Sequence, residues 1–179
     1  MGVSEYLQSL VVTTKAGNVE SFGQIYDLLV DRIYRFFYFR VGIKEEAEDL
    51  TEQIFLKVYT KINNYQNNGI PFEAWMFKIA RNQLIDYYRT KKTLVSLDKV
   101  EQVTSKDNDP EAAAENELTK EAIFNALKNL PHTYQEMIIL KFIEEKDNKE
   151  ISKILNKPVS HIRVLQNRSL KALRKVLKI

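Results

Sequence analysis

The chain has 179 residues, no cysteine and a formal net charge of +3. That length allows one domain or two small ones, and a composition of 44% hydrophobic and 28% charged residues is typical of a soluble globular protein. The lack of cysteine excludes disulfides and thiolate metal sites. The N-terminus lacks the pattern of a signal peptide, and no apolar run is long enough for a membrane span. We therefore expect a soluble, cytoplasmic protein without membrane insertion.

Charge is distributed unevenly along the chain. Residues 1–97 have a net charge of +1, residues 98–117 of −5, and residues 118–179 of +7. A basic C-terminal segment suits a polyanionic partner such as nucleic acid, whereas the acidic segment would be repelled by the same partner.

The first hundred residues show helical periodicity throughout. A short amphipathic helix is expected near residues 4–15. A capping box at Ser21 to Gln24 then predicts a helix that ends at Gly42, because glycine readily takes the left-handed angles of a helix C-terminus. Residues 44–62 predict a third helix, whose inward positions are Ala47, Leu50, Ile54, Val58 and Ile62.

A loop and a further helix follow. Residues 63–71 are rich in Asn and Gly and close with proline, which predicts a loop. The helix from Phe72 to about Lys92 mixes aromatic and cationic side chains. Such a mixture suits single-stranded nucleic acid, since charges follow the backbone while rings stack on bases; the alternative is that the aromatic side chains simply form core.

Residues 93–109 are polar and weakly periodic, so we interpret them as a linker. Asp109, Pro110 and Glu111 then predict a helix start, and that helix ends at Pro131. No segment alternates with period two. The predicted fold is all-α, with two small helical domains (1–92 and 110–179) joined by a flexible acidic linker (93–109).

The C-terminal domain has the pattern of a helix-turn-helix. A capping box from Thr133 to Glu136 predicts a helix that turns Ile138, Ile139 and Phe142 inward. Asp147 to Glu150 opens a second, short helix with an apolar stripe of Ile151, Ile154 and Leu155. Asn156 and Pro158 end it, because proline cannot continue a helix and Asn tolerates left-handed angles.

The last helix starts near Ser160 and carries an unusual charge pattern. It contains six cations between Arg163 and Lys178 and no acidic residue. Solvated helices normally mix signs to gain pairs four residues apart, so the absence of acids argues against a merely solvated face. A short helix, a tight turn and a cationic helix together predict a recognition helix in the DNA major groove.

Five blocks in this order resemble the extracytoplasmic-function (ECF) group of bacterial sigma-70 RNA polymerase sigma factors. They are EEAEDLTEQIFLKVY (45–59), PFEAWMFKIARNQLIDYYR (71–89), DPEAAAENEL (109–118), LPHTYQEMIILKF (130–142) and HIRVLQNRSLKALR (161–174). The resemblance implies a sigma-2-like domain at 1–92 that binds core polymerase and the −10 promoter element. It implies a sigma-4-like helix-turn-helix domain at 110–179 that binds the −35 element.

The resemblance also implies roles for individual residues. The contact to core polymerase would involve Asp49, Leu50, Gln53, Phe55 and Leu56. The −10 element would be read and held open by the 63–71 loop and by Trp75, Lys78, Arg81, Asn82, Asp86 and Arg89. The −35 element would face Ser160, His161, Arg163, Val164, Asn167, Arg168 and Lys171.

The implied partners are core RNA polymerase, through its beta-prime clamp helices and beta flap, promoter DNA, and an anti-sigma factor. We expect no cofactor and no metal. We also expect no catalysis, because His132 and His161 have no neighbouring carboxylate cluster or cysteine in the sequence. The alternative function is a stand-alone helix-turn-helix transcriptional regulator with an N-terminal sensing or dimerising domain.

Overall fold

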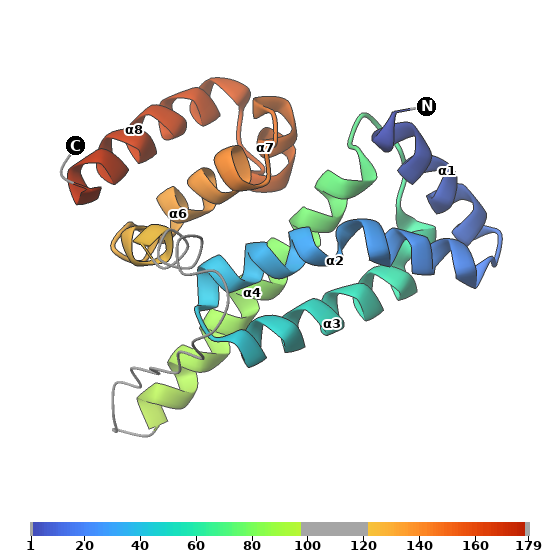
Figure 1. The fold of residues 1–179 in the computed structure, drawn as a ribbon, viewed down its shortest axis with the longest axis horizontal. Coiled ribbons are helices and arrows are strands. Elements are labelled where there is room, and N and C mark those ends of the chain that lie inside the picture. Colours follow the sequence, from blue (N-terminus) through green and yellow to red (C-terminus); the bar gives the residue numbers. More distant parts are fainter. Residues whose placement is uncertain (1, 98–121, 178–179) are drawn as a thin grey trace, which may run out of the picture.

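The computed structural model describes residues 2–97 and 122–177, and within these ranges all regular structure is helical (Figure 1). The prediction of an all-α fold is therefore confirmed. In the described part of the chain, no helix is long and apolar enough to cross a membrane.

Four long helices form the N-terminal unit: α1 (Val3–Lys15), α2 (Val19–Val41), α3 (Lys44–Lys61) and α4 (Phe72–Leu97). Helix α2 packs between α1 and α3, and α4 contacts all three (Figure 1). A 3₁₀ turn, η1 (Ile62–Asn64), leads from α3 into the loop before α4. The inward positions predicted for α3 are all buried.

The C-terminal unit comprises a helix over residues 122–128, α6 (His132–Ile138), a π-helical turn η2 (Ile139–Ile143), α7 (Asn148–Leu155) and α8 (Val159–Leu177). Helix α8 packs against both α6 and α7. The chain between α7 and α8 reverses at Asn156, which has φ 53°. This confirms the predicted left-handed turn of the helix-turn-helix.

Local capping signals in two places behave as the sequence indicates. Gly42 ends α2 with φ 75°, and its N–H donates to the Tyr38 carbonyl. The Asp147 carboxylate accepts from the Lys149 and Glu150 N–H groups, and the Glu150 carboxylate accepts from the Asp147 N–H. Both ends are set by interactions within a few residues of the terminus, which is why the sequence reveals them.

Two predicted caps are wrong. Helix α2 starts one turn earlier than the Ser21 capping box implies, because the Asn18 side chain accepts from the Ser21 N–H and leaves Ser21 inside the helix. At α6 no side chain caps the N-terminus, and Glu136 contacts the N-terminal unit instead. At α2 the cap comes from Asn18, and at α6 the Glu136 carboxylate pairs with Arg81 of the N-terminal unit.

Two further expectations differ from the structure. The capping box at Thr133 predicts that Phe142 points inward, yet Phe142 is 48% exposed, because η2 is π-helical and shifts the helical register after Ile138. Helix α4 continues to Leu97, beyond its expected end near Lys92, so the first residues assigned to the linker are helical. The predicted helix start at Asp109 lies outside the described residues.

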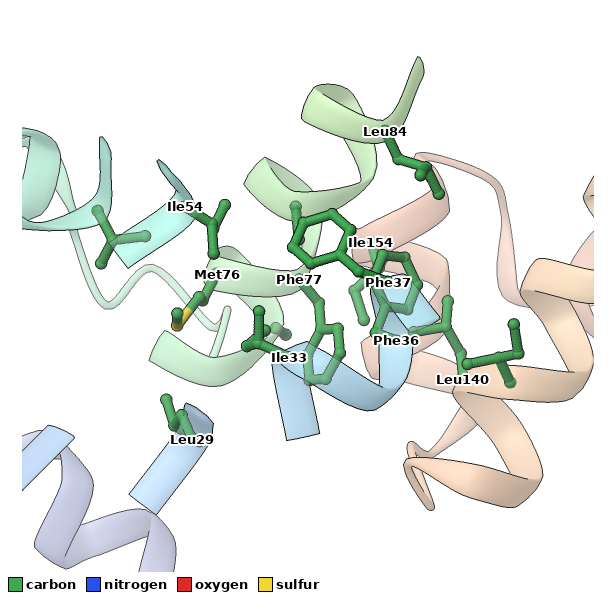
Figure 2. Packing of buried hydrophobic residues seen from close by; sticks show 14 of the residues in the cluster. Leu29, Ile33, Phe36, Phe37, Ile54, Met76, Phe77, Leu84, Leu140 and Ile154 are labelled. Atoms are coloured by element: carbon green, nitrogen blue, oxygen red, sulfur yellow. The ribbon is translucent and has the colours of Figure 1, made fainter. Parts of the chain in front are cut away.

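Buried side chains of the two units form one continuous hydrophobic cluster. Figure 2 shows Phe36 and Phe37 of α2 near Leu140 of η2 and Ile154 of α7, and Phe77 and Leu84 of α4 belong to the same cluster. Helix α7 packs directly against α4, and η2 against α2. In this structure the two units are therefore closed against one another by an apolar contact as well as by charged groups.

A candidate nucleic-acid interface

The exposed face of α8 gathers the residues expected to read DNA. Its buried positions are Ile162, Leu165 and Ser169, which fix the side turned toward the core. All seven candidate residues lie on the opposite side and are exposed: Ser160, His161, Arg163, Val164, Asn167, Arg168 and Lys171. No ion pair involves the three cations of this set within the described residues, so their charge is available to an anionic ligand.

The candidate residues on α4 are less uniform. Trp75 is half-buried in an aromatic cluster with Tyr65 and Phe72, at ring-centroid distances of 5.3 and 5.5 Å. The aromatic core interpretation therefore holds for Phe72 and, in part, for Trp75. Asn82, Asp86 and Arg89 are exposed, and Lys78 and Arg81 are half-buried.

Tyr65 closes the loop before α4 and fixes its shape. It is buried, and its hydroxyl donates to the Ile70 carbonyl at 2.8 Å. The Lys15 ammonium on α1 donates to the Tyr65 carbonyl and lies 5.6 Å from the Tyr65 ring centre. The loop residues from Gln66 to Gly69 are exposed, and the contacts of Tyr65 fix the start of this loop.

The residues expected to contact core polymerase divide into two groups. Asp49, Gln53 and Leu56 are exposed, with Leu56 at 69%, whereas Leu50 and Phe55 are buried. Leu50 and Phe55 therefore pack in the core beneath the exposed Asp49, Gln53 and Leu56. The Gln83 amide of α4 donates to the Leu50 carbonyl at 3.0 Å and ties α3 to α4 at this point.

A cavity of about 730 Å³ opens between α3 and α4. It combines Asp49, Leu50 and Gln53 of the core-polymerase set with Asp86 of the −10 set. At one end Glu46 of α3 pairs with Lys91 of α4 at 2.9 Å and accepts from the Tyr87 hydroxyl. The structure thus places the two predicted sites on adjoining faces of the same helix pair.

Charged side chains that the sequence does not single out connect the two units. Glu144, whose side chain is fully buried, pairs with Arg32 at 3.1 Å and with Arg35 at 3.3 Å. Lys146, also buried, pairs with Glu73 at 2.6 Å. A separate pair joins Arg81 of the −10 set to Glu136 of α6 at 2.8 Å.

Burial dominates the electrostatics of the two C-terminal carboxylates. It raises the pKa of Glu136 above its ordinary value of 4.5, against the opposing attraction of Arg81 and Arg40. It raises the pKa of Glu144 in the same way, against Arg35 and Arg32. Desolvation therefore exceeds the attraction of the partners, as is common for buried ion pairs.

Aromatic rings also meet between the two units. His132 of α6 lies 5.1 Å from the Tyr88 ring of α4, and Phe124 lies 6.1 Å from Tyr38 of α2. Burial lowers the pKa of His132, with Arg40 adding to the effect. Contacts between residues this far apart in the sequence leave no local pattern from which to predict them.

Comparison with known proteins agrees with this arrangement. Residues 25–93 match the family described as Sigma-70 region 2, and residues 120–173 match Sigma-70, region 4. The chain is 31% identical over 182 residues to the ECF RNA polymerase sigma factor SigW of Bacillus subtilis, covering 96% of this chain and 97% of SigW. It is 30% identical over 176 residues to BldN of Streptomyces coelicolor, covering 97% of this chain and 67% of BldN.

Two solved structures share the fold. CnrH, in complex with the cytosolic domain of CnrY, superposes with a TM-score of 0.75 at 18% identity and covers 97% of each chain. The sigma factor RpoE of Bartonella quintana, in complex with the anti-sigma factor NepR, gives a TM-score of 0.73 at 21% identity, with coverage of 90% and 99%.

The N-terminal unit is a helical bundle with an aromatic and basic helix, and the C-terminal unit is a cationic helix-turn-helix. The chain matches both sigma-70 regions in order, which defines a transcription initiation factor. The chain belongs to the ECF RNA polymerase sigma factors of the sigma-70 family. It directs transcription initiation and is not an enzyme. Family membership decides against the alternative of a stand-alone regulator.

Proposed function

We propose that α4 with the loop before it binds and opens the −10 element, and that α8 binds the −35 element in the major groove. The two roles belong to the two predicted domains, −10 binding to residues 1–92 and −35 binding to residues 110–179, with the linker at 93–109. The observation that carries the proposal is the face of α8, where three cations that form no ion pair with any described residue lie with four other exposed side chains opposite the buried Ile162, Leu165 and Ser169. A helix of this kind offers phosphate contacts for register and side chains for base edges.

The proposed core-polymerase surface is the exposed part of α3, namely Asp49, Gln53 and Leu56, supported by Leu50 and Phe55. Leu56, at 69% exposed, is the apolar side chain of this set that a protein partner would cover. The beta-prime clamp helices are the proposed partner there, and the beta flap is the proposed partner of the C-terminal unit. The carrier polymerase raises the local concentration of both DNA-binding helices at a promoter.

An anti-sigma factor is the further proposed partner. CnrH and RpoE share this fold and were solved with CnrY and NepR. A protein that covers the same helices would compete with core polymerase, which is a direct route to regulation.

The test is transcription in vitro with purified core RNA polymerase and fragmented genomic DNA as template. The expected result is a set of discrete start sites that share two sequence motifs upstream at constant spacing. Transcripts that share only one motif, or none, would contradict the proposal that two separate helices read two elements. Core polymerase alone on the same template is the control.

A further inference from the structure

Helix α1 lies beside the connection between α3 and α4 (Figure 1), and it contacts both η1 and α4. It precedes residues 25–93, which match sigma-70 region 2, and none of its residues belongs to the sets expected to contact DNA or core polymerase. Two of its side chains, Gln8 and Lys15, nevertheless contact Tyr65 at the start of the loop before α4. Part of the support of this loop therefore comes from outside the matched region.

Tyr65 connects the two ends of the loop. It is buried, and its ring packs against Trp75 of the −10 set at a centroid distance of 5.3 Å. Burial raises the pKa of its hydroxyl, which therefore stays protonated at neutral pH. The hydroxyl donates its one proton to the Ile70 carbonyl at 2.8 Å, and the Gln8 amide oxygen lies 3.3 Å from the same hydroxyl oxygen. Residues 66–69 thus form a short segment whose flanking residues are joined by a hydrogen bond.

Lys15 fixes the backbone at the first end of the loop. Helix α3 continues directly into η1, and Tyr65 is the first residue after that helical run. The carbonyls at the end of a helix lack intrahelical partners and carry partial negative charge, so a cation there is favourable. The Lys15 ammonium donates to the Tyr65 carbonyl and lies 5.6 Å from the Tyr65 ring centre. Both the backbone and the side chain of Tyr65 are therefore held.

Between these anchors the loop presents one free amide. The Asn68 N–H donates to the Gln66 carbonyl at 2.8 Å, and the Asn68 side-chain amide donates to the Gln66 side-chain oxygen at 3.0 Å. Asn67 lies between these two residues, is exposed, and makes no side-chain hydrogen bond to any residue that the structure describes. A carboxamide whose donors and acceptor are all free can pair with the edge of an unpaired base.

We propose that Lys15 and Tyr65 are positioning residues for −10 recognition, and that they hold Asn67 in one orientation before promoter DNA arrives. The inference rests on the proposed function of α4 and its loop. A loop that is already ordered does not lose conformational freedom when it binds, and it cannot rearrange to fit a different base. Helix α1 thereby contributes to promoter selectivity through the shape of the loop.

The first experiment measures the order of the loop in the free, full-length protein. Nitrogen-15 relaxation gives the order parameters of the Asn67, Asn68 and Gly69 N–H groups. We expect about 0.85 in the wild type, the value of rigid backbone, and about 0.6 or lower in Tyr65→Phe, which removes only the hydroxyl. Flexible values in the wild type, or rigid values in both Tyr65→Phe and Lys15→Met, would overturn the proposal.

The second experiment measures base selectivity in the complex with core RNA polymerase. The templates combine a −35 element from a start site used by the wild type with a −10 element randomised at every position. Sequencing of the transcripts gives the base preference at each position. Tyr65→Phe and Lys15→Met should each lower the preference at one and the same −10 position by about 2–10-fold, the effect of losing one hydrogen bond, and leave the other positions unchanged. Asn67→Ala should lower the preference at that position too.

Matched variants separate positioning from a general loss of packing. Lys15→Arg keeps a cationic donor and should retain the wild-type preference. Tyr6→Phe removes a different hydroxyl hydrogen bond of α1, the one to Gln24, and should leave the −10 preference unchanged. Lys44→Met, at an exposed cation at the opposite end of α3 from η1, should also leave it unchanged. An equal loss in these controls, or an even loss at every −10 position, would contradict the positioning role.

The outcomes distinguish this inference from the proposed function. If the wild type shows no base preference at any randomised −10 position, the proposed function of α4 and its loop fails, whatever the order parameters show. If the wild type is selective and both Tyr65→Phe and Lys15→Met keep its full selectivity, the positioning role is overturned while the proposed function stands.

Discussion

On α8, Arg163 and Leu165 lie two positions apart and face opposite ways, one into solvent and the other into the core. The difference follows from the helical period, because two positions correspond to about 200° of rotation. Each exposed residue of this helix therefore has its direction fixed by a buried neighbour. A substitution on the exposed face therefore leaves the packing of the helix intact.

Replacing Arg163 or Arg168 with Ala should weaken binding of the polymerase complex to promoter DNA. A lost bidentate contact to a base costs about 1–3 kcal/mol, whereas a lost phosphate contact weakens binding to all sequences and lowers its salt dependence. The measurement is promoter affinity at several salt concentrations. Lys175→Ala, at an exposed cation outside the proposed site, serves as the control, and equal effects from all three variants would contradict the assignment.

Asn82 is exposed on α4 and belongs to the proposed −10 set. Asn82→Ala should therefore leave the formation of the closed promoter complex nearly unchanged and impair DNA opening, because an amide suits hydrogen bonding to an unpaired base. Permanganate reactivity of thymines near −10 measures the opened strand. Wild-type reactivity in the variant, compared with Thr90→Ala further along α4, would remove Asn82 from the site.

At the scale of single helices, short-range chemistry sets the ends. The second helix of the helix-turn-helix has only eight residues, and its reciprocal cap between Asp147 and Glu150 satisfies N–H groups that would otherwise lack partners. Asn156 ends the same helix in the left-handed region. A helix this short relies on its caps and on burial of Ile151, Ile154 and Leu155.

Asp147→Ala should lower the free energy of unfolding by about 1 kcal/mol, because the N-cap carboxylate that accepts from the Lys149 and Glu150 N–H groups is lost. Urea unfolding followed by circular dichroism gives the change. Lys153→Ala, on the exposed side of the same helix, should lie within about 0.5 kcal/mol of the wild type. A loss for Asp147→Ala no greater than that of the control would contradict the capping role.

The predictable features are those set by neighbours in the sequence. Gly42, Asp147 and Asn156 each act through groups within a few residues, and the α8 face follows from periodicity alone. Glu136 shows the opposite case: its spacing from Thr133 predicts a cap, but Arg81, more than fifty positions earlier, takes the carboxylate. A single sequence carries no signal for such a pairing.

For the molecule as a whole, the contact between the units matters more than either unit alone. Its carboxylates Glu136 and Glu144 are buried, and burial raises the pKa of both above 4.5. The closed, folded state then holds protons more tightly than the unfolded chain. Stability from these groups is therefore fully present below the ordinary carboxyl pKa and is lost as pH rises through the raised pKa.

A variant with Glu136→Gln and Glu144→Gln removes both titrating groups and should flatten that dependence. As pH falls from neutral toward the ordinary carboxyl pKa of 4.5, the wild type should gain stability relative to the variant. Urea unfolding of both proteins across that range gives their free energies of unfolding. The difference between the two values removes the contribution of the other carboxyl groups. Parallel curves would show that the two carboxylates titrate normally.

The most direct test of the account is where each helix lies on a promoter. Single cysteines from Thr90→Cys on α4 and Arg174→Cys on α8, both at exposed positions, allow an iron chelate that cleaves nearby DNA to be attached to either helix. In the complex with core polymerase, we expect cleavage near −10 from the first position and near −35 from the second. Cleavage of one element from both positions, or of neither element, would contradict the assignment of α4 to the −10 element and α8 to the −35 element.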